Sequence, residues 1–523
     1  MNNCDIIVVG SGCGGLTAAA TAALKGKKVL LLERHNAPGG FATSFVRGRF
    51  EFEASLHELC GFGMDEGEGS VRKILDDLKL SSAIKWAVVP HAYRVITKAR
   101  DGSRIDAVMP FGVENYIEKM EQYVPGSLPS MKRLFALADD IAKSLDFLGN
   151  IGKYDFKTLY TILKEHLNFI RTAPYSVDEV LNALAVPPKA QDIFNAYWSY
   201  LGSPTDMLSF VHYIMMVRSY LTFGAVIPKY RSYDLSAAIA NSIERNGGQI
   251  WYNSHVSRIL IENGKAYGVK LADKRELYAK EIICDISPSS VFSKMLSHED
   301  VPAVDLKLAN ARKFGARGLC LYVGLNRSAQ TLGISDYSVF LYDTANTREQ
   351  YTLMGNLGTN NAQATVCLNL ADPACSPKGT AILCFTSFYT SDFFSEVAPE
   401  EYFKLKDKIA EKMISNYEHK LNVNIRDYIE EIEVATPVTF ARYTDSPQGT
   451  IYGYLAEDWD GIIPRTMMQE ADFSPLGIYF CGGWGSMLSG YSSAMGSGYK
   501  TVCNIIKAEK EEKAKEEAAN EQK

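Results

Sequence analysis

Short apolar runs and polar breaks alternate over the first 33 residues in a pattern that predicts a strand, a helix and a second strand. Residues 5–9 (DIIVV) are β-branched, residues 16–26 (LTAAATAALKG) are rich in alanine, and residues 27–33 (KKVLLLE) are apolar again. β-branched runs bounded by turn residues are typical of buried strands, and alanine is the strongest helix former. The chain therefore opens with the pattern of an α/β domain.

The break between the first strand and the helix contains glycines in G-x-G-x-x-G spacing, at Gly10, Gly12 and Gly15. In a dinucleotide-binding turn the first glycine permits the tight bend. The second lets backbone approach a diphosphate, and the third lets the helix lie close to the sheet. Glu33 ends the second strand, where a carboxylate accepts hydrogen bonds from a free adenosine ribose. The alternative is an ordinary glycine-rich turn, which does not require the acid.

The patterning changes several times along the rest of the chain. Residues 45–53 (FVRGRFEFE) alternate like a strand pair with a turn at Arg47-Gly48, and Ser176 is a predicted helix N-cap. Residues 113–222 contain successive amphipathic stretches that predict helices, ending in the very apolar, aromatic block 196–226. The α/β pattern returns over residues 233–295. Residues 296–440 combine strands with a charged helix at 400–421, which is typical of an antiparallel sheet that carries helices. The final apolar run before residue 482 leads into a helix of small residues.

These changes predict an α/β fold, in which a Rossmann-type nucleotide-binding domain is assembled from three separate segments. The second domain is predicted to be α+β, with an antiparallel sheet and a helical part that faces either its own core or a membrane. The predicted boundaries are 1–75, 225–295 and 440–506 for the nucleotide domain, 76–224 and 296–439 for the substrate domain, and 507–523 for a charged tail.

Composition narrows the class of protein. A chain of 523 residues is too long for a single hydrophobic core, so two or more domains are expected. A net charge of −6 without a basic stripe gives no reason to expect nucleic acid as a partner. The ten cysteines stand singly and the eight histidines form no cluster, which predicts free thiols and no metal site. No run has the length of a membrane span and no signal peptide is recognisable. We expect a cytoplasmic protein, with peripheral membrane contact left open.

Four blocks of the chain resemble the flavoprotein family of phytoene desaturases, carotenoid isomerases and retinol saturases, within the wider amine-oxidase-like FAD fold. Together with the helical stretch from SVDEVLNAL to LGSP, they cover nearly the whole chain except the charged tail. The blocks are VVGSGCGGLTAA with LLERHNAPGGFATSF; FEFEASLHELCGFG; GAVIPKYRSYDLSAAIANSIERNGGQI with SHVSRILIENGKAYGVKL; and TPVTFARYTDSPQGTIYG with GIYFCGGWGSMLSGYSSAMGSGYKTV.

The resemblance implies that the bound dinucleotide is FAD. It implies that Gly39 and Gly40 pass beneath the ribityl and diphosphate groups, and that the backbone at Val256 holds the adenine edge. It also implies that the turn 482–485 and the helix after Gly490 reach the isoalloxazine, whose reduced form a helix N-terminus stabilises. The candidate cofactor contacts are Gly10, Gly12, Cys13, Gly14, Gly15, Glu33, Arg34, Gly39, Gly40, Val256, Gly482, Gly483, Trp484 and Gly490.

The chain departs from this family at two places. The family's usual Pro-x-Gly-Gly is Pro228-Lys229-Tyr230-Arg231 here, and the common Asp-x-Gly is Glu53-Ala54-Ser55. Both departures lie where the substrate is expected to meet the flavin. They leave the substrate and the direction of the reaction open, but they do not change the cofactor that the resemblance implies.

Three residues are candidate catalytic groups. His57 is the candidate acid or base, because imidazole titrates near neutrality, and its alternative is a core histidine satisfied by backbone. Trp484 and Tyr491 either form a wall over the flavin or simply pack. Lys229 and Arg231 either pair with a phosphate or a substrate carboxylate, or are solvated loop charges.

Two further features have alternatives of their own. The aromatic and Met-rich block from Tyr197 to Phe223 either lines a tunnel for a long apolar molecule or forms ordinary helix core. Cys60 and Cys481 flank the expected site, but nothing nearby suggests a lowered thiol pKa, so we expect neither a flavin–cysteine bond nor a redox-active cysteine.

The sequence therefore predicts an FAD-dependent oxidoreductase that saturates, desaturates or isomerises C=C bonds of a hydrophobic polyene or lipid-like substrate. One alternative is an FAD-dependent amine oxidase on the same fold, although Trp484 is the only obvious aromatic cage residue. A second alternative is a non-catalytic escort of prenylated or lipidated partners. The intact glycines and Glu33 argue against it. No second intact dinucleotide motif is present, so the electron donor or acceptor is left open.

Overall fold

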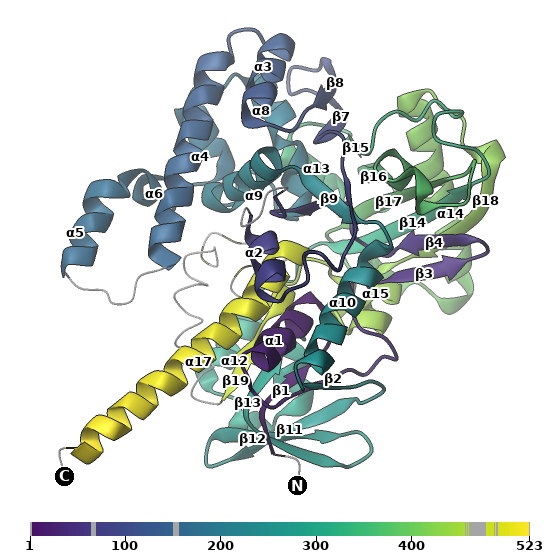
Figure 1. Ribbon diagram of the computed structural model, residues 1–523. Helices are drawn as coiled ribbons and strands as arrows, with labels where there is room; N and C mark the ends of the chain where they lie inside the picture. Colours follow the sequence, from purple (N-terminus) through teal and green to yellow (C-terminus); the bar gives the residue numbers. More distant parts are fainter. Residues whose placement is uncertain are drawn as a thin grey trace.

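The chain folds around two seven-stranded sheets. In Figure 1 the first sheet lies in the lower half of the molecule, the second lies at the upper right, and a group of helices lies at the upper left. The structure is a computed structural model, and it describes residues 3–63, 69–149, 156–455, 457, 459, 477–485, 487 and 490–521.

The first sheet has the strand order β10-β2-β1-β13-β12-β11, with β19 paired to β13. Its strands are β1 (Asn3–Val9), β2 (Val29–Leu32), β10 (Gln249–Trp251), β11 (Val256–Glu262), β12 (Lys265–Leu271), β13 (Glu276–Cys284) and β19 (Ile478–Phe480). β1, β2, β10, β13 and β19 are parallel, and Val9 pairs with Leu32 and Cys284, which itself pairs with Phe480. The carboxyl ends of β1, β2, β13 and β19 therefore meet at one edge, where open α/β sheets bind ligands.

Three helices cover one face of this sheet side by side: α1 (Cys13–Leu24), α10 (Arg231–Arg245) and α17 (Tyr491–Glu521). Every residue of α1 from Cys13 to Ala23 is buried. α17 approaches it closely at Gly498, where a Cβ would collide with the carbonyl oxygen of Gly14. Small residues therefore bring the two backbones into contact, as the small-residue pattern of the last helix predicts.

The second sheet has the order β18-β14-β17-β16-β15-β7-β8. All its neighbours are antiparallel except β7 and β15, which are parallel, so the antiparallel sheet expected from the sequence contains one parallel pair. Its strands are β7 (Tyr93–Lys98), β8 (Arg104–Met109), β14 (Arg317–Leu325), β15 (Ser338–Leu341), β16 (Gln363–Cys367), β17 (Ala381–Tyr389) and β18 (Ile429–Ala435). The charged helix α14 (Pro399–Leu421) packs its apolar side against this sheet.

The region from residue 113 to residue 223 is helical, as predicted. Its helices are α3 (Val113–Tyr123), α4 (Leu128–Gly149), α5 (Phe156–Glu165), α6 (Leu167–Thr172), α7 (Val177–Ala183), α8 (Pro188–Phe194), the 3-10 helix η1 (Asn195–Tyr200) and α9 (Phe210–Phe223). The predicted N-cap Ser176 forms a capping box with Glu179. The apolar block 196–226 is not one helix, because residues 201–209, which include Gly202 and Pro204, separate η1 from α9.

Two small sheets and several short helices connect the large elements. The predicted hairpin around Gly48 is present as β3 (Ser44–Arg47) and β4 (Phe50–Glu53), and β9 (Ala225–Pro228) pairs with both β5 (Leu59–Cys60) and β6 (Trp86–Val88). Further short helices are α2 (Ser70–Asp77), α11 (Pro288–Ser290), α12 (Ala303–Ala311), α13 (Thr347–Leu353) and α15 (Pro437–Thr444). Figure 1 labels α2, α12, α13 and α15.

α17 continues through the predicted charged tail to Glu521, and its last turns are exposed. Lys27 of the loop after α1 makes an ion pair with Glu509 of this helix. Within the described part of the chain, no helix combines the length and the apolar character that crossing a bilayer requires.

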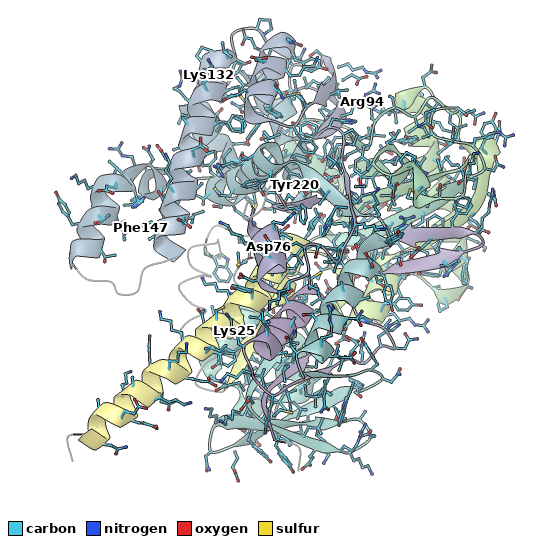
Figure 2. The ribbon with its side chains drawn as sticks, in the orientation of Figure 1. Lys25, Asp76, Arg94, Lys132, Phe147 and Tyr220 are labelled. Atoms are coloured by element: carbon cyan, nitrogen blue, oxygen red, sulfur yellow. The ribbon has the colours of Figure 1, made fainter. Side chains whose placement is uncertain are left out.

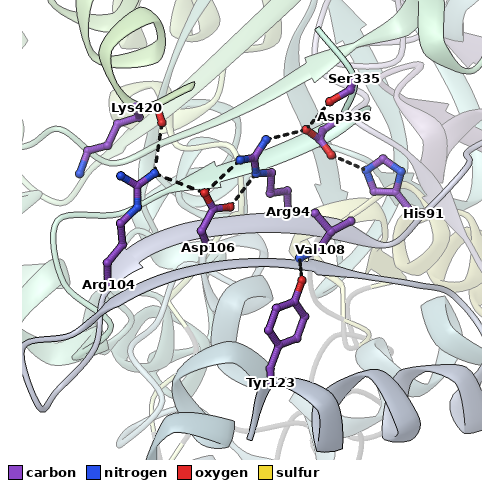
Figure 3. A network of polar contacts seen from close by, with 9 residues as sticks. All are labelled: His91, Arg94, Arg104, Asp106, Val108, Tyr123, Ser335, Asp336 and Lys420. Carbon is purple, nitrogen blue, oxygen red and sulfur yellow. Dashed lines mark hydrogen bonds and ion pairs between the residues drawn. The ribbon is translucent and has the colours of Figure 1, made fainter. Parts of the chain in front are cut away.

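One edge of the second sheet is held by a charged network around Arg94 of β7, shown in Figure 3. The guanidinium donates to both carboxylate oxygens of Asp106 at 2.8 and 3.0 Å, and to Asp336 at 2.9 Å. His91 lies 3.8 Å from the second oxygen of Asp336. Bidentate arginine–carboxylate pairs are geometrically specific, so this network fixes β7 against β8 and the segment that precedes β15.

Arg231 connects the two domains where α10 begins. Its side chain is 4% exposed and donates to the backbone carbonyls of Glu51 (3.1 Å), Lys229 (3.3 Å) and Cys375. Arg231 is therefore not a solvated loop charge, and its donors satisfy backbone acceptors from three segments. Lys229, by contrast, is exposed.

Replacing Arg231 with lysine is expected to lower the free energy of unfolding by about 2–3 kcal/mol, because an ammonium cannot reach three carbonyls spread around a planar guanidinium. The measurement is the urea midpoint of the full chain. Arg245→Lys, at the exposed end of the same helix, is the matched control and should change the midpoint little. Equal effects of the two substitutions would contradict the connecting role of Arg231.

Candidate functional site

The glycine-rich turn lies at the common edge of the parallel strands. Gly10 has a φ of 95°, its N–H donates to the carbonyl of Leu32 at 2.9 Å, and Gly12 is the N-cap of α1. A Cβ on Gly15 would collide with the carbonyl oxygen of Gly10. The tight bend and the close helix–strand packing predicted from the spacing are therefore present, and α1 directs its free N–H groups toward the strand ends.

A second glycine pair closes around this turn. The N–H of Gly39 donates to the carbonyl of Ser11 at 2.8 Å, and Gly39 forms a bridge with Gly12. A Cβ on Gly40 would lie 3.3 Å from the Cα of Gly12. Residues 39 and 40 thus lie directly against the turn, on the side where the resemblance expects the diphosphate.

The third stretch of glycines follows β19. Gly482 lies so close to Gly14 that a Cβ on Gly14 would be in collision with the Gly482 backbone. We call Gly12, Gly14 and Gly482 the glycine cradle, because these three residues bring bare backbone from two distant segments to one place. Gly483 follows in the same 3-10 turn, and Gly490, exposed with a φ of 107°, precedes α17.

Glu33 directly follows β2, beside the turn, and is 9% exposed. Its Oε2 accepts hydrogen bonds from the N–H and the hydroxyl of Ser11 at 2.8 and 2.6 Å, and its Oε1 accepts from the N–H of His35 at 2.7 Å. The carboxylate is thus fixed at the strand end. Val256 is buried at the start of β11. Two residues earlier, the N–H of Ser254 donates to the carbonyl of Glu33.

Arg34 points elsewhere. Its guanidinium donates to the carbonyl of Arg442 at 2.9 Å and lies 3.3 Å from the carboxylate of Asp445 at the end of α15. In this structure the side chain of Arg34 therefore holds α15, while its cofactor contact stays a prediction.

Trp484 and Tyr491 lie at different places. Trp484 packs edge-on against Tyr454 and Phe314, with ring centroids 5.1 and 6.5 Å apart. The hydroxyl of Tyr491 donates to the carbonyl of Phe41 at 2.8 Å and lies 2.9 Å from the hydroxyl of Ser55. Each side chain has packing partners in the protein, and their role at a flavin stays a prediction.

Residues 53–60 lead from the N-terminus of α17 into the second domain. Ser55 contacts Tyr491, and the hydroxyl of Ser492 donates to the carbonyl of Cys60 at 2.8 Å. Between them, the Nε2 of His57 lies 2.8 Å from the hydroxyl of Thr386 on β17. His57 therefore lies between two residues that contact the first turn of α17, but its ring is directed into the second sheet.

The neighbour of His57 is a second buried ionisable group. Tyr200 donates a hydrogen bond to Oε1 of Glu58 at 2.9 Å, and its hydroxyl lies 3.4 Å from Nδ1 of His57. Glu58 is 5% exposed, and its Oε2 has no hydrogen-bond partner among the residues that the structure describes. Tyr220 of α9, labelled in Figure 2, directs its hydroxyl to the carbonyl of Glu58 at 3.5 Å.

Burial shifts the pKa values of His57 and Glu58 in opposite directions. It lowers the pKa of His57 to about 4 and raises the pKa of Glu58 to about 8, although the Tyr200 hydrogen bond acts against the second shift. At neutral pH the imidazole is neutral and the carboxyl carries a proton. Of the two, Glu58 is the group that holds a transferable proton, and the sequence did not single it out.

Aromatic rings surround this pair. Tyr197 stacks on Tyr200 and on Tyr220, with centroids 5.3 and 4.9 Å apart, and Phe340 lies edge-on to Tyr200 at 5.2 Å. The block from Tyr197 to Phe223 therefore contributes core packing, as its plainer interpretation predicts, and it also provides the wall around Glu58. The thiols of Cys60 and Cys481 have pKa values raised by burial, in line with the expectation that they are not reactive.

Asp285, the first residue after β13, is the other site residue that the sequence did not indicate. Its Oδ2 accepts a hydrogen bond from the N–H of Gly15 at 2.8 Å. The only available signal was an acid directly after a buried strand. Its significance depends on the pairing of β13 with β1, which are separated by about 270 residues along the chain.

Comparisons with known proteins agree with this architecture. The family model described as an NAD(P)-binding Rossmann-like domain matches residues 8–78. The all-trans-retinol 13,14-reductase of Danio rerio is 25% identical over 96% of this chain and 86% of its own length. Prolycopene isomerase 1 of an Oncidium hybrid cultivar is 24% identical over 86% of this chain and 75% of its own length. A putrescine oxidase variant has the same fold, with a TM-score of 0.64, 14% identity, and coverage of 96% of this chain and 99% of its own.

The strand-end glycines and the first sheet form a Rossmann-like architecture, and the second sheet with its helices accompanies it. Similarity to the retinol 13,14-reductase and to the prolycopene isomerase extends over most of this chain and over three quarters or more of each relative.

Replacing Glu58 with glutamine is expected to change how stability depends on pH. Between the ordinary glutamate pKa, about 4.3, and about 8, the folded wild type holds a proton that the unfolded chain has lost, so its stability falls as pH rises. The glutamine variant lacks this loss. Its advantage should grow by up to about 1.4 kcal/mol per pH unit and level off above the folded pKa.

The measurement is the urea midpoint of both proteins at several pH values. Glu262→Gln, at the exposed end of β11, is the control and should follow the wild type at every pH. A constant difference between the Glu58 variant and the wild type would show that Glu58 is ionised throughout.

Proposed function

We propose that this protein is an FAD-dependent oxidoreductase that saturates, desaturates or isomerises C=C bonds of a hydrophobic polyene or lipid-like substrate. The observation that carries the proposal is the glycine cradle at the carboxyl ends of β1, β13 and β19. It combines with full-length similarity to relatives that are named for retinol and prolycopene.

The residues at the strand ends fit FAD. Gly12, Gly14 and Gly482 carry no side chains of their own, as binding of a diphosphate at the start of α1 requires. Glu33 is fixed beside it where a ribose is expected, and Gly39 and Gly40 complete the turn. FAD, when bound, would supply hydride transfer, and the protein needs to add binding, orientation and protons.

The second domain fits an apolar substrate. Tyr200 and Tyr220 contact Glu58, Tyr197 and Phe340 pack against these tyrosines, and burial keeps the Glu58 carboxyl protonated at neutral pH. A protonated carboxyl among aromatic rings can give a proton to a carbon atom whose neighbour accepts a hydride, as saturation of a C=C bond requires. Peripheral membrane contact, a cytoplasmic location and the electron partner stay predictions.

Two alternatives are distinguished by experiment. The amine-oxidase alternative has support from the putrescine oxidase fold, but Trp484 packs against Tyr454 and Phe314 and forms no cage with a second flavin-side aromatic among the described residues. The escort alternative requires no cofactor, and the intact glycine cradle argues against it.

Purified protein is expected to be yellow or to bind added FAD, with quenching of flavin fluorescence as the measurement. Gly14→Ala should weaken FAD binding at least about tenfold, because the added methyl group is directed into the Gly482 backbone beside the diphosphate. Lys25→Ala, at the exposed end of α1, is the control and should bind FAD like the wild type. Circular dichroism establishes that both variants are folded. A folded wild type that takes up no FAD would overturn the proposal.

Anaerobic incubation with carotenoids, retinoids and unsaturated fatty acids should identify the reaction. Bleaching of the oxidised flavoprotein indicates desaturation, recovery of flavin colour from the reduced form indicates saturation, and product change without net redox indicates isomerisation. Hydrogen peroxide released with simple amines, and no reaction with any polyene or lipid, would instead establish the amine oxidase.

A further inference from the structure

Asp285 places a carboxylate at the centre of the glycine cradle. Its N–H donates to the carbonyl of Val9 at 2.9 Å, which continues the pairing of β13 with β1 past the last strand residue. Because β13 lies between β1 and β19, the side chain emerges where the three strands end. No residue of the dinucleotide motif itself supplies this charge.

The carboxylate touches bare backbone on several sides. Oδ2 accepts from the N–H of Gly15 at 2.8 Å, and a Cβ on Gly12 would lie 2.5 Å from the same oxygen. A Cβ on Gly14 would lie 3.0 Å from Oδ1, and one on Gly482 would collide with it. The carboxylate oxygens of Asp285 therefore lie next to the backbone amides that bind a diphosphate at the N-terminus of a helix.

The groups that face Asp285 do not compensate its charge. They are Glu33 at the end of β2, Cys13 of α1, Cys284 of β13 and Cys481 after β19, and burial raises the pKa of each of the three thiols. In the described part of the chain no lysine, arginine or histidine forms an ion pair with it. Burial, with a smaller contribution from Glu33, raises the pKa of Asp285 to about 7, against the amides of Gly15 and Gly12, which lower it.

We propose that Asp285 is protonated when the diphosphate of FAD occupies the cradle, so that binding of the cofactor takes up one proton. A carboxylate and a diphosphate at the same helix N-terminus repel each other, whereas a neutral carboxyl can donate its O–H to a diphosphate oxygen. Asp285 is thus a positioning residue that makes FAD affinity depend on pH. The inference rests on the proposed function, because it takes FAD as the ligand.

The experiment is a titration of the cofactor-free full chain with FAD from about pH 6 to about pH 9, followed by flavin fluorescence. Wild-type affinity should fall by up to about tenfold per pH unit above neutrality. Asp285→Asn keeps the shape and the acceptor for Gly15 but cannot ionise. Its affinity should be nearly independent of pH and at least about tenfold tighter than the wild type at the alkaline end.

Asp273→Asn, in the exposed turn at the other end of β13, removes the same charge and should retain the wild-type pH profile. Calorimetry of the wild type in two buffers of different ionisation enthalpy measures proton uptake directly and needs no folded variant. Uptake close to one proton just above neutral pH supports the proposal. A wild-type affinity that is flat with pH, or no proton uptake, would overturn it. Absence of FAD binding at every pH would instead overturn the proposed function, on which this inference rests.

Discussion

Contact between bare backbones is the constraint on which the candidate site depends. Gly12 and Gly14 belong to the start of α1, and Gly482 to the 3-10 turn after β19. A Cβ on Gly14 would collide with the backbone of Gly482, and a Cβ on Gly12 or on Gly482 would collide with the carboxylate of Asp285. Gly498 repeats the arrangement between α1 and α17. A methyl group at any of these points requires one segment to move, so the position of α17 and the shape of the cradle are coupled through close packing.

The same contacts make α17 the link between the two domains. Its first turn holds Ser55 and Cys60, and the segment between them carries His57 and Glu58 into the aromatic interior of the second domain. Arg231 ties the start of α10 to both β4 and the loop near Cys375. α17 thus packs against the cradle segment at Gly498 and, through hydrogen bonds, also holds the segment that carries the buried carboxyl.

Burial gives both candidate acids their character. Glu58 among tyrosines and Asp285 among glycines have pKa values raised toward or above neutrality, while His57 is kept neutral. Burial thereby allows ordinary glutamate and aspartate side chains to hold protons near pH 7. Histidine, the residue type that usually supplies such a proton, is present as His57 at 3.4 Å from the hydroxyl of Tyr200, but burial keeps it uncharged.

The sequence by itself determined the elements with strong local patterns. The β-branched run, the G-x-G-x-x-G turn and Glu33 predicted the nucleotide-binding unit, Gly48 its hairpin, and Ser176 a helix start, because short-range backbone geometry and periodicity decide these features. The break at Gly202 was hidden in a continuous apolar block. Only the tertiary structure decided that Asp285 enters the cradle and that Glu58, not His57, holds the proton. Both depend on strand pairing across hundreds of residues and on burial, which no local pattern records.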